Sequence, residues 1–147
     1  MKRFCGALLF LGLAGCPEPP KGQQMEQAVG GLAHLHSWDP NTEAKGQYAY
    51  DAVMGWGPEI RFVLALHLTD ETPTVIYEPL TQRNPVVGDI CFLTLLRMTG
   101  LPWQQFSREG VFLSTALPNP VFCLKWDPGA RGRVQRRFYE ILPPPEQ

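Results

Sequence analysis

The sequence lacks the short motifs that mark most enzymes. None of its serines, Ser37, Ser107 and Ser114, lies in the Gly-x-Ser-x-Gly turn that exposes a hydrolase nucleophile. It also has no glycine-rich loop of the kind that binds phosphates. The motifs therefore name no reaction, and we predict no enzyme, no cofactor and no metal ion.

The sequence also has no excess of positive charge and no long apolar run. There are 13 Lys and Arg against 14 Asp and Glu, so the overall charge gives no attraction to nucleic acid or to an anionic bilayer. Aromatic and basic residues do not interleave as they do in RNA-binding proteins. The apolar run at residues 4–14 is shorter than the about 20 residues that cross a membrane. We therefore expect neither a nucleic-acid partner nor a spanning helix there.

What is present at the start is typical of a secretory signal. Lys2 and Arg3 precede the apolar run, and small residues follow it. The segment Leu13-Ala14-Gly15-Cys16 resembles the lipobox of bacterial lipoproteins. In that family the cysteine sulfur, here that of Cys16, receives a diacylglycerol and the preceding peptide is removed. The resemblance implies a bilayer partner through acylated Cys16; the alternative is an ordinary cleaved signal in which Cys16 is incidental.

The resemblance also implies a location and a division of the chain. Acyl chains on Cys16 would hold the protein at a bacterial envelope membrane, and Pro17 in place of Asp favours the outer membrane over the inner one. Without Lys2 and Arg3, 11 of the 13 basic side chains remain against 14 acidic ones. We predict a signal peptide at 1–15, a lipidated tether at 16–24, a single helical domain at 25–142 and a tail at 143–147.

Apolar periodicity predicts a mainly α fold, a small helical bundle with short helices because proline is frequent (15 residues). Helices are expected near 25–36, 48–56, 58–68, 87–99 and 127–142. The helix at 48–56 carries Tyr48, Ala52, Val53 and Trp56 on one face. The cleanest stripe is that of the helix at 87–99, where Gly100 fits the C′ position. Its apolar positions are Val87, Ile90, Cys91, Thr94, Leu95 and Met98.

Residues 111–124 suggest a short β-hairpin, and they include one of two cysteines beyond the anchor. The apolar runs 111–113 and 121–124 flank the turn-forming residues 117–120. In an oxidising compartment Cys91 and Cys123 could form a disulfide, which would close a loop of about 33 residues and stabilise the fold by about 3–4 kcal/mol. The alternative is two buried apolar thiols.

Two segments resemble the paired helices of a HEAT-type repeat. The first helix of such a repeat is similar to the segment from Gly57-Pro58-Glu59-Ile60 through Leu68-Thr69-Asp70. The partner helix is similar to the segment from Val87-Gly88-Asp89-Ile90-Cys91 through Met98-Thr99-Gly100. The second segment also resembles bacterial helical proteins with a Val-Gly-Asp start. The resemblance covers about residues 47–100 and implies a protein-binding scaffold without catalytic residues. Because the link at 71–85 is long and no second copy follows, we expect one such hairpin within a compact bundle.

Four arginines near the C-terminus form a candidate binding surface: Arg131, Arg133, Arg136 and Arg137. Guanidinium groups bind acidic lipid headgroups, lipopolysaccharide phosphates or peptidoglycan carboxylates. The alternative is a solvated helix face that pairs with Asp127 and Glu140. The sequence therefore predicts a membrane-anchored domain that binds an envelope protein or an anionic envelope polymer.

Two other functions stay open. The carboxylates of Asp51, Asp70, Glu71 and Asp89 could converge in space, and a pocket that held Asp70, Asp89 and His67 together would indicate a small envelope hydrolase. A purely structural lipoprotein is the third alternative.

Three tryptophans and a pair of histidines are further candidate binding residues. A broad groove lined by Trp38, Trp56 or Trp103 would indicate binding rather than catalysis. His34 and His36 would face one way on a strand and could bind a metal, but on a helix they diverge.

Overall fold

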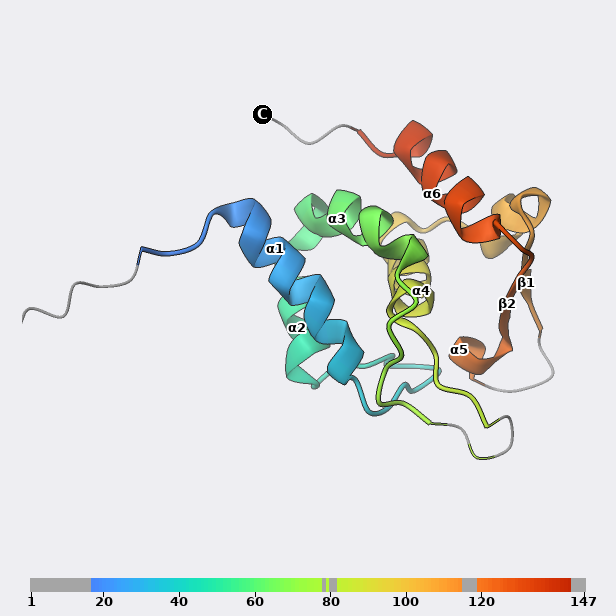
Figure 1. Ribbon diagram of the computed structural model, residues 1–147, viewed down its shortest axis with the longest axis horizontal. Coiled ribbons are helices and arrows are strands. Elements are labelled where there is room, and N and C mark those ends of the chain that lie inside the picture. The colour runs from blue at the N-terminus through green and yellow to red at the C-terminus, as the bar shows by residue number, and fades with distance from the viewer. Residues whose placement is uncertain (1–16, 78, 80–81, 115–118, 144–147) are drawn as a thin grey trace, which may run out of the picture.

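The computed structural model describes residues 17–77, 79, 82–114 and 119–143. The protein is mainly helical with one small antiparallel sheet, which confirms the predicted fold class (Figure 1). In chain order, with η for 3-10 helices, the elements are α1 (Lys21–Gly30), η1 (Gly31–His34), α2 (Tyr48–Gly55), η2 (Gly57–Ile60), α3 (Arg61–Leu66), η3 (His67–Thr69), α4 (Val87–Thr99), η4 (Trp103–Glu109), β1 (Val111–Leu113), α5 (Pro120–Cys123), β2 (Leu124–Trp126) and α6 (Ala130–Ile141).

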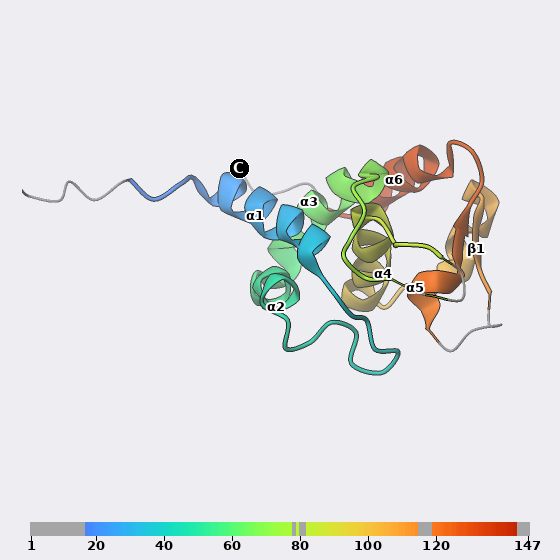
Figure 2. The same cartoon turned by 60° about the horizontal axis from the view of Figure 1, so that its bottom comes forward.

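Helix α4 runs through the centre of the protein. Every residue from Val87 to Leu95 is buried, because α1 and α2 lie on one side of it and η4, the hairpin and α6 on the other (Figures 1 and 2). Gly100 ends the helix in the left-handed conformation, with φ 69°. The predicted stripe and its glycine C-cap are therefore confirmed, and the burial extends beyond the stripe because neighbours cover both faces.

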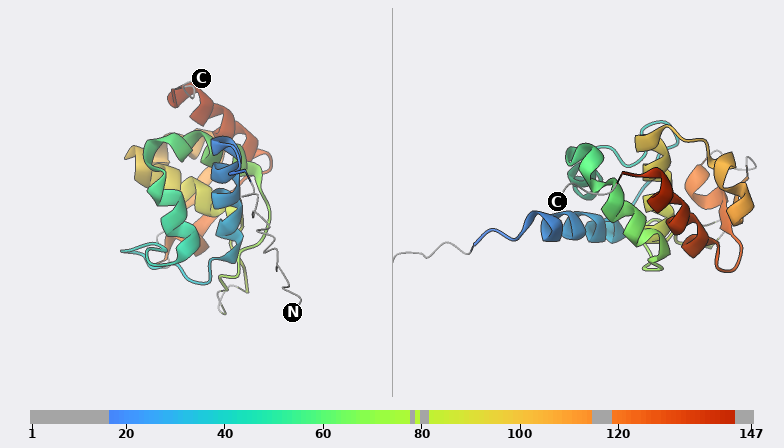
Figure 3. Two further views of the ribbon diagram at one scale, coloured as in Figure 1. Left: turned by 90° about the vertical axis from the view of Figure 1, so that its left-hand side faces the viewer. Right: turned by 90° about the horizontal axis from the view of Figure 1, so that it is seen from above.

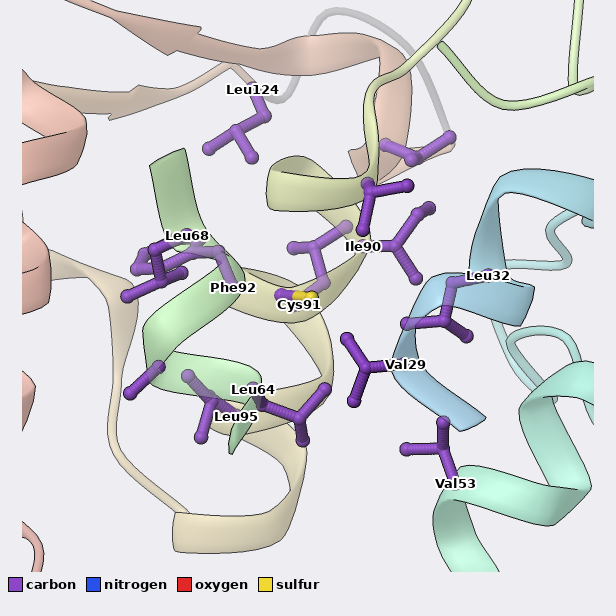
Figure 4. Close-up of a cluster of buried hydrophobic side chains, with 14 of the residues drawn as sticks. Val29, Leu32, Val53, Leu64, Leu68, Ile90, Cys91, Phe92, Leu95 and Leu124 are labelled. Atoms are coloured by element: carbon purple, nitrogen blue, oxygen red, sulfur yellow. The ribbon is translucent and has the colours of Figure 1, made fainter. Parts of the chain in front are cut away.

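The core continues outward from α4 in both directions. On one side Val29, Leu32 and Val53 of α1, η1 and α2 point toward α4 (Figure 4). On the other side the Phe92 ring meets Phe106 edge-on, with centroids 5.5 Å apart, and Phe106 stacks on Phe138 at 4.7 Å. One continuous core thus joins the two ends of the chain.

The Val87-Gly88-Asp89 start of α4 connects three parts of the fold. The buried carboxylate of Asp89 accepts hydrogen bonds from the Val86 N–H (3.0 Å), the Trp126 indole N–H (2.8 Å) and Arg131 Nη2 (2.5 Å). It therefore caps its own helix, as an acidic residue in the first turn does, and also holds β2 and α6. The Asn84 side chain, just before this helix, donates to the Thr74 carbonyl.

The predicted hairpin exists, but the position of its second strand was wrong. β1 pairs with β2 so that Val111 is opposite Trp126 and Leu113 opposite Leu124. Residues 121–123 belong to the short helix α5, because the Asn119 side chain accepts the Val121 N–H and Pro120 occupies the first turn. The apolar Val-Phe-Cys run resembled a strand because a short buried run has no period of its own.

At the N-terminal side, α1 begins at Lys21 and so covers four residues of the predicted tether. Residues 17–20 before it are exposed and non-helical. The predicted signal peptide, Cys16 and the last four residues of the predicted tail lie outside the described residues. Within the part of the chain that the structure describes, no helix has the length and apolar character needed to cross a membrane.

Candidate functional site

The apolar face of α2 is wider than the core that it meets. Tyr50 and Val53 are buried, whereas the Tyr48 side chain is 90% exposed and Ala52 and Trp56 are only half-buried. The expected single face over Tyr48, Ala52, Val53 and Trp56 is therefore divided: Val53 lies in the core, Trp56 packs against its edge, and Tyr48 is exposed. An apolar helix stripe normally packs against the rest of the protein, so the open part is a departure that calls for an occupant.

A groove of about 780 Å³ lies along this open stripe, between α1 with η1 on one side and α2 on the other. Small residues line both of its walls, Ala28 of α1 and Gly31 of η1 on one side and Ala49 and Ala52 of α2 on the other. A Cβ added at Gly31 would lie 3.6 Å from that of Ala49, so the two walls approach each other closely at these two residues. Figure 3 (left) views the protein from this side.

The groove lining is uncharged and offers a few free polar groups. It contains no Lys, Arg, Asp or Glu. The Gln47 side chain is already engaged, since it donates to the Ser37 carbonyl (2.7 Å) and accepts the His36 N–H (3.1 Å). By contrast, the side chains of Gln27, His34 and Tyr48 make no hydrogen bond within the described parts of the chain. Such a lining, apolar with a few polar groups, is typical of ligand sites.

Only one of the three candidate tryptophans lines the groove. Trp56 does so, whereas Trp38 is buried with its ring edge-on to Tyr50, at 5.8 Å between centroids. Trp103 packs against the core as part of η4. His34 and His36 also line the groove, and across the described ranges no group of three or more His, Cys, Asp or Glu could hold a metal ion.

The four candidate arginines do not share one surface. Arg131 forms the ion pair with buried Asp89 and lies 4.5 Å from the Trp126 ring centroid, so it stabilises the fold. Arg133, Arg136 and Arg137 line a hollow between α6 and η4, and Arg108 of η4 joins them there. Arg108 could not be predicted as part of this hollow because nothing local in the sequence links it to α6.

Three of the four candidate acidic residues are engaged in separate structural contacts, and the fourth, Glu71, is exposed. The Asp51 carboxylate accepts the Gly46 N–H at 3.1 Å, and Asp89 is held by Arg131. Asp70 accepts the Thr72 N–H (2.9 Å) and lies 3.2 Å from His67 Nδ1. None of these contacts joins Asp89 to His67 in a pocket, so the hydrolase alternative gains no geometric support.

His67 is held between two carboxylates. Its Nε2 lies 2.6 Å from Glu26 of α1, and its Nδ1 faces Asp70. Burial alone would lower the pKa of His67, but hydrogen bonds to Glu26 and Asp70, together with their negative charges, raise the pKa overall. The contacts of His67 with Glu26 and Asp70 therefore link α1 to η3 by an ionic interaction.

Cys91 and Cys123 are both buried. Cys91 is a free thiol inside the core, where its sulfur lies among apolar side chains (Figure 4). Burial raises the pKa of the Cys91 thiol, and the charges of Asp70 and Asp89 add to this effect. In this structure Cys91 is not bonded to Cys123.

No protein-family model, curated protein or solved structure shows significant similarity to this chain. No enzyme family is thus found for it, and its function must be inferred from its own surfaces.

Proposed function

We propose that this chain is a lipid-anchored protein of a bacterial envelope whose helical domain binds an apolar segment of a partner protein in the groove between α1 and α2. The observation that carries the binding proposal is the groove itself, lined by exposed Tyr48, by partly buried Ala52 and Trp56 and by small residues. The anchor rests on the lipobox-like segment that ends at Cys16.

The composition of the groove favours a protein segment over a charged polymer. An anionic polymer would need cationic partners, and the lining has no Lys or Arg. An apolar side chain, in contrast, could insert between Tyr48 and Trp56 against the small residues of the walls. Tyrosine and tryptophan are the residues that most often contribute large binding energies at protein interfaces. Free groups at the edge, such as the Gln27 amide and the His34 ring, can pair with the partner's backbone.

The groove would be tested by site-specific photocrosslinking in the cell. A photoreactive residue at position 48 is expected to capture one defined partner, and the capture should be lost when Ala52→Trp fills the groove. The control position is Phe112, which is 51% exposed on β1, away from α1 and α2. Crosslinks from position 48 that survive Ala52→Trp in a folded variant, or no crosslinks beside a working positive control, would favour a purely structural lipoprotein.

The anchor is tested separately with Cys16→Ala. We expect the wild-type chain to begin at Cys16 with added acyl mass and to fractionate with membranes, and the variant to incorporate no lipid label. Unchanged labelling of the variant would disprove the anchor but leave the groove proposal intact, because the two depend on different residues.

A further inference from the structure

We propose that the hollow between η4 and α6 is a binding site for a phosphate group, formed by Arg108, Arg133, Arg136 and Arg137. This site is independent of the α1–α2 groove. The hollow has a volume of about 700 Å³. η4 lies beside the start of α6 in Figures 1 and 3, although the two elements are separated in sequence by the hairpin.

The four guanidinium groups differ in the contacts that they make. Arg133 is held in place, since its Nε donates to the Glu109 carbonyl (3.1 Å) and its Nη1 to that of Pro128 (3.2 Å). Arg137 pairs with Glu140 at 2.9 Å on the exposed surface. Arg108 and Arg136 are exposed and make no hydrogen bond or ion pair with any other described residue. Two unpaired guanidiniums therefore stand beside one that is held in place.

The charge of the hollow suits a phosphate. Its lining holds four guanidinium groups and two carboxylates, those of Glu109 and Glu140, which gives a formal charge of +2. The whole chain, in contrast, has a net charge of −1, so this is a local positive site. A phosphate monoester carries a charge of about −1.5 to −2 at neutral pH, and its oxygens accept from several donors at once.

Geometry and neighbouring groups favour phosphate over a single carboxylate. A guanidinium donates two parallel hydrogen bonds to a pair of phosphate oxygens, and several arginines around one hollow can serve several oxygens. The side chains of Gln104 and Gln105 on η4 line the same hollow and add neutral donors. A ligand with only two acceptor oxygens would leave most of these donors unused.

The test compares two double variants of the full chain. Arg108→Ala with Arg136→Ala removes the two unpaired arginines of the hollow. Arg83→Ala with Arg97→Ala removes the same charge from exposed positions elsewhere. Binding of inorganic phosphate is measured by calorimetry, with acetate at equal ionic strength as the carboxylate competitor. Circular dichroism confirms that both variants are folded.

We expect phosphate binding to weaken at least about tenfold in the hollow variant, because charge-assisted hydrogen bonds are lost, and to stay within about twofold in the control. The proposal would be overturned if both variants weakened binding equally or if acetate bound as well as phosphate. It would also be overturned if the wild-type chain bound neither inorganic phosphate nor vesicles with phosphatidic acid.

A vesicle experiment identifies the source of the phosphate. Phosphatidylcholine vesicles with and without phosphatidic acid are compared, and the acyl anchor contributes equally to both. If Arg108 and Arg136 increase binding only when phosphatidic acid is present, while inorganic phosphate binds weakly, the ligand is a lipid headgroup. If inorganic phosphate binds and the vesicles show no difference, it is a soluble phosphate compound.

Discussion

Gly88 has the least space for a larger side chain among the glycines of the described chain. A Cβ at this position would lie 2.5 Å from the Leu68 carbonyl oxygen, 2.5 Å from Arg131 Nη1 and 3.0 Å from the Asp70 carbonyl oxygen. Two of these atoms belong to the backbone and cannot rotate away. The glycine of the Val-Gly-Asp start is thus explained by close packing and not by an unusual backbone angle.

Gly88→Ala is therefore expected to lower the free energy of unfolding by about 1–3 kcal/mol, because a well-packed site must open, although alanine favours helix. Gly30→Ala is the matched control, since Gly30 is helical and no atom would lie within 4 Å of its Cβ. The control should be neutral or stabilising by up to about 1 kcal/mol. Urea unfolding of both variants checks this, and equal effects would contradict it.

Cys91 is expected to resist alkylation in the native protein, because the reactive thiolate is disfavoured in the core. In denaturant without reductant it should react at once. The measurement is the intact mass after iodoacetamide treatment, with and without denaturant. Protection that persists in denaturant until a reductant is added would show that Cys91 is bonded, and Cys123 would then be its expected partner.

The helix α1 is attached to the rest of the protein by apolar packing and by ionic contacts. Val29 faces the core, Lys21 pairs with Glu59, and Glu26 pairs with His67. Because the groove uses α1 as one wall, the stability of this attachment bears on the proposed binding function.

The contact between Glu26 and His67 should make stability depend on pH. The pKa of His67 is raised in the folded state, so the stabilisation is complete below the ordinary histidine pKa and is lost as the pH rises through the raised value. The advantage of the wild-type protein over His67→Gln should therefore shrink as the pH rises from below the ordinary histidine pKa, about 6.5, into the alkaline range. Chemical denaturation across this range measures it. His36→Gln, whose ring has no hydrogen bond or ion pair in the described chain, is the matched control substitution. A wild-type advantage over His67→Gln that stays constant across this range would contradict the predicted ionic contact.

The prediction of an element succeeded where its apolar residues are covered by the rest of the protein and was incomplete where they are not. α4 is buried around a regular stripe and ends at a left-handed glycine, so its periodicity and cap were visible in the sequence. α2 also has a regular apolar face, but only part of it meets the core. Periodicity records that residues are apolar and cannot show whether a neighbour covers them, so the groove was hidden within an ordinary helix pattern.

We expect the stability of the whole protein to depend on the aromatic cluster around Phe92. Its ring contacts those of Phe106 and Trp126, with centroids 5.5 and 5.1 Å away, and Phe138 completes the group. Elements from the middle and the end of the chain thus share one core, which predicts that they unfold together.

Phe92→Ala should destabilise the protein by about 3–5 kcal/mol in a single cooperative transition, because it leaves a cavity at this junction. Phe112→Ala is the matched control, and because its ring is 51% exposed the change should stay within about 0.5 kcal/mol. Thermal unfolding followed by circular dichroism and by tryptophan fluorescence would reveal both effects. Two separate transitions in the wild-type protein would show that the halves do not share their stability.

Local patterns were enough to place the α-helices other than α5, because periodicity, proline positions and glycine caps act within a few residues, as the segment from Val87 to Gly100 shows. They did not predict η4 or α5. The character of each surface came from contacts between distant residues. Arg131 looked like its exposed neighbours until Asp89, 42 residues away, was found to bind it. Arg108 likewise joined the arginines of α6, and the α2 stripe stayed open, only because of how the helices pack. Burial and charge pairing are properties of the folded neighbourhood, so no short stretch of sequence contains them.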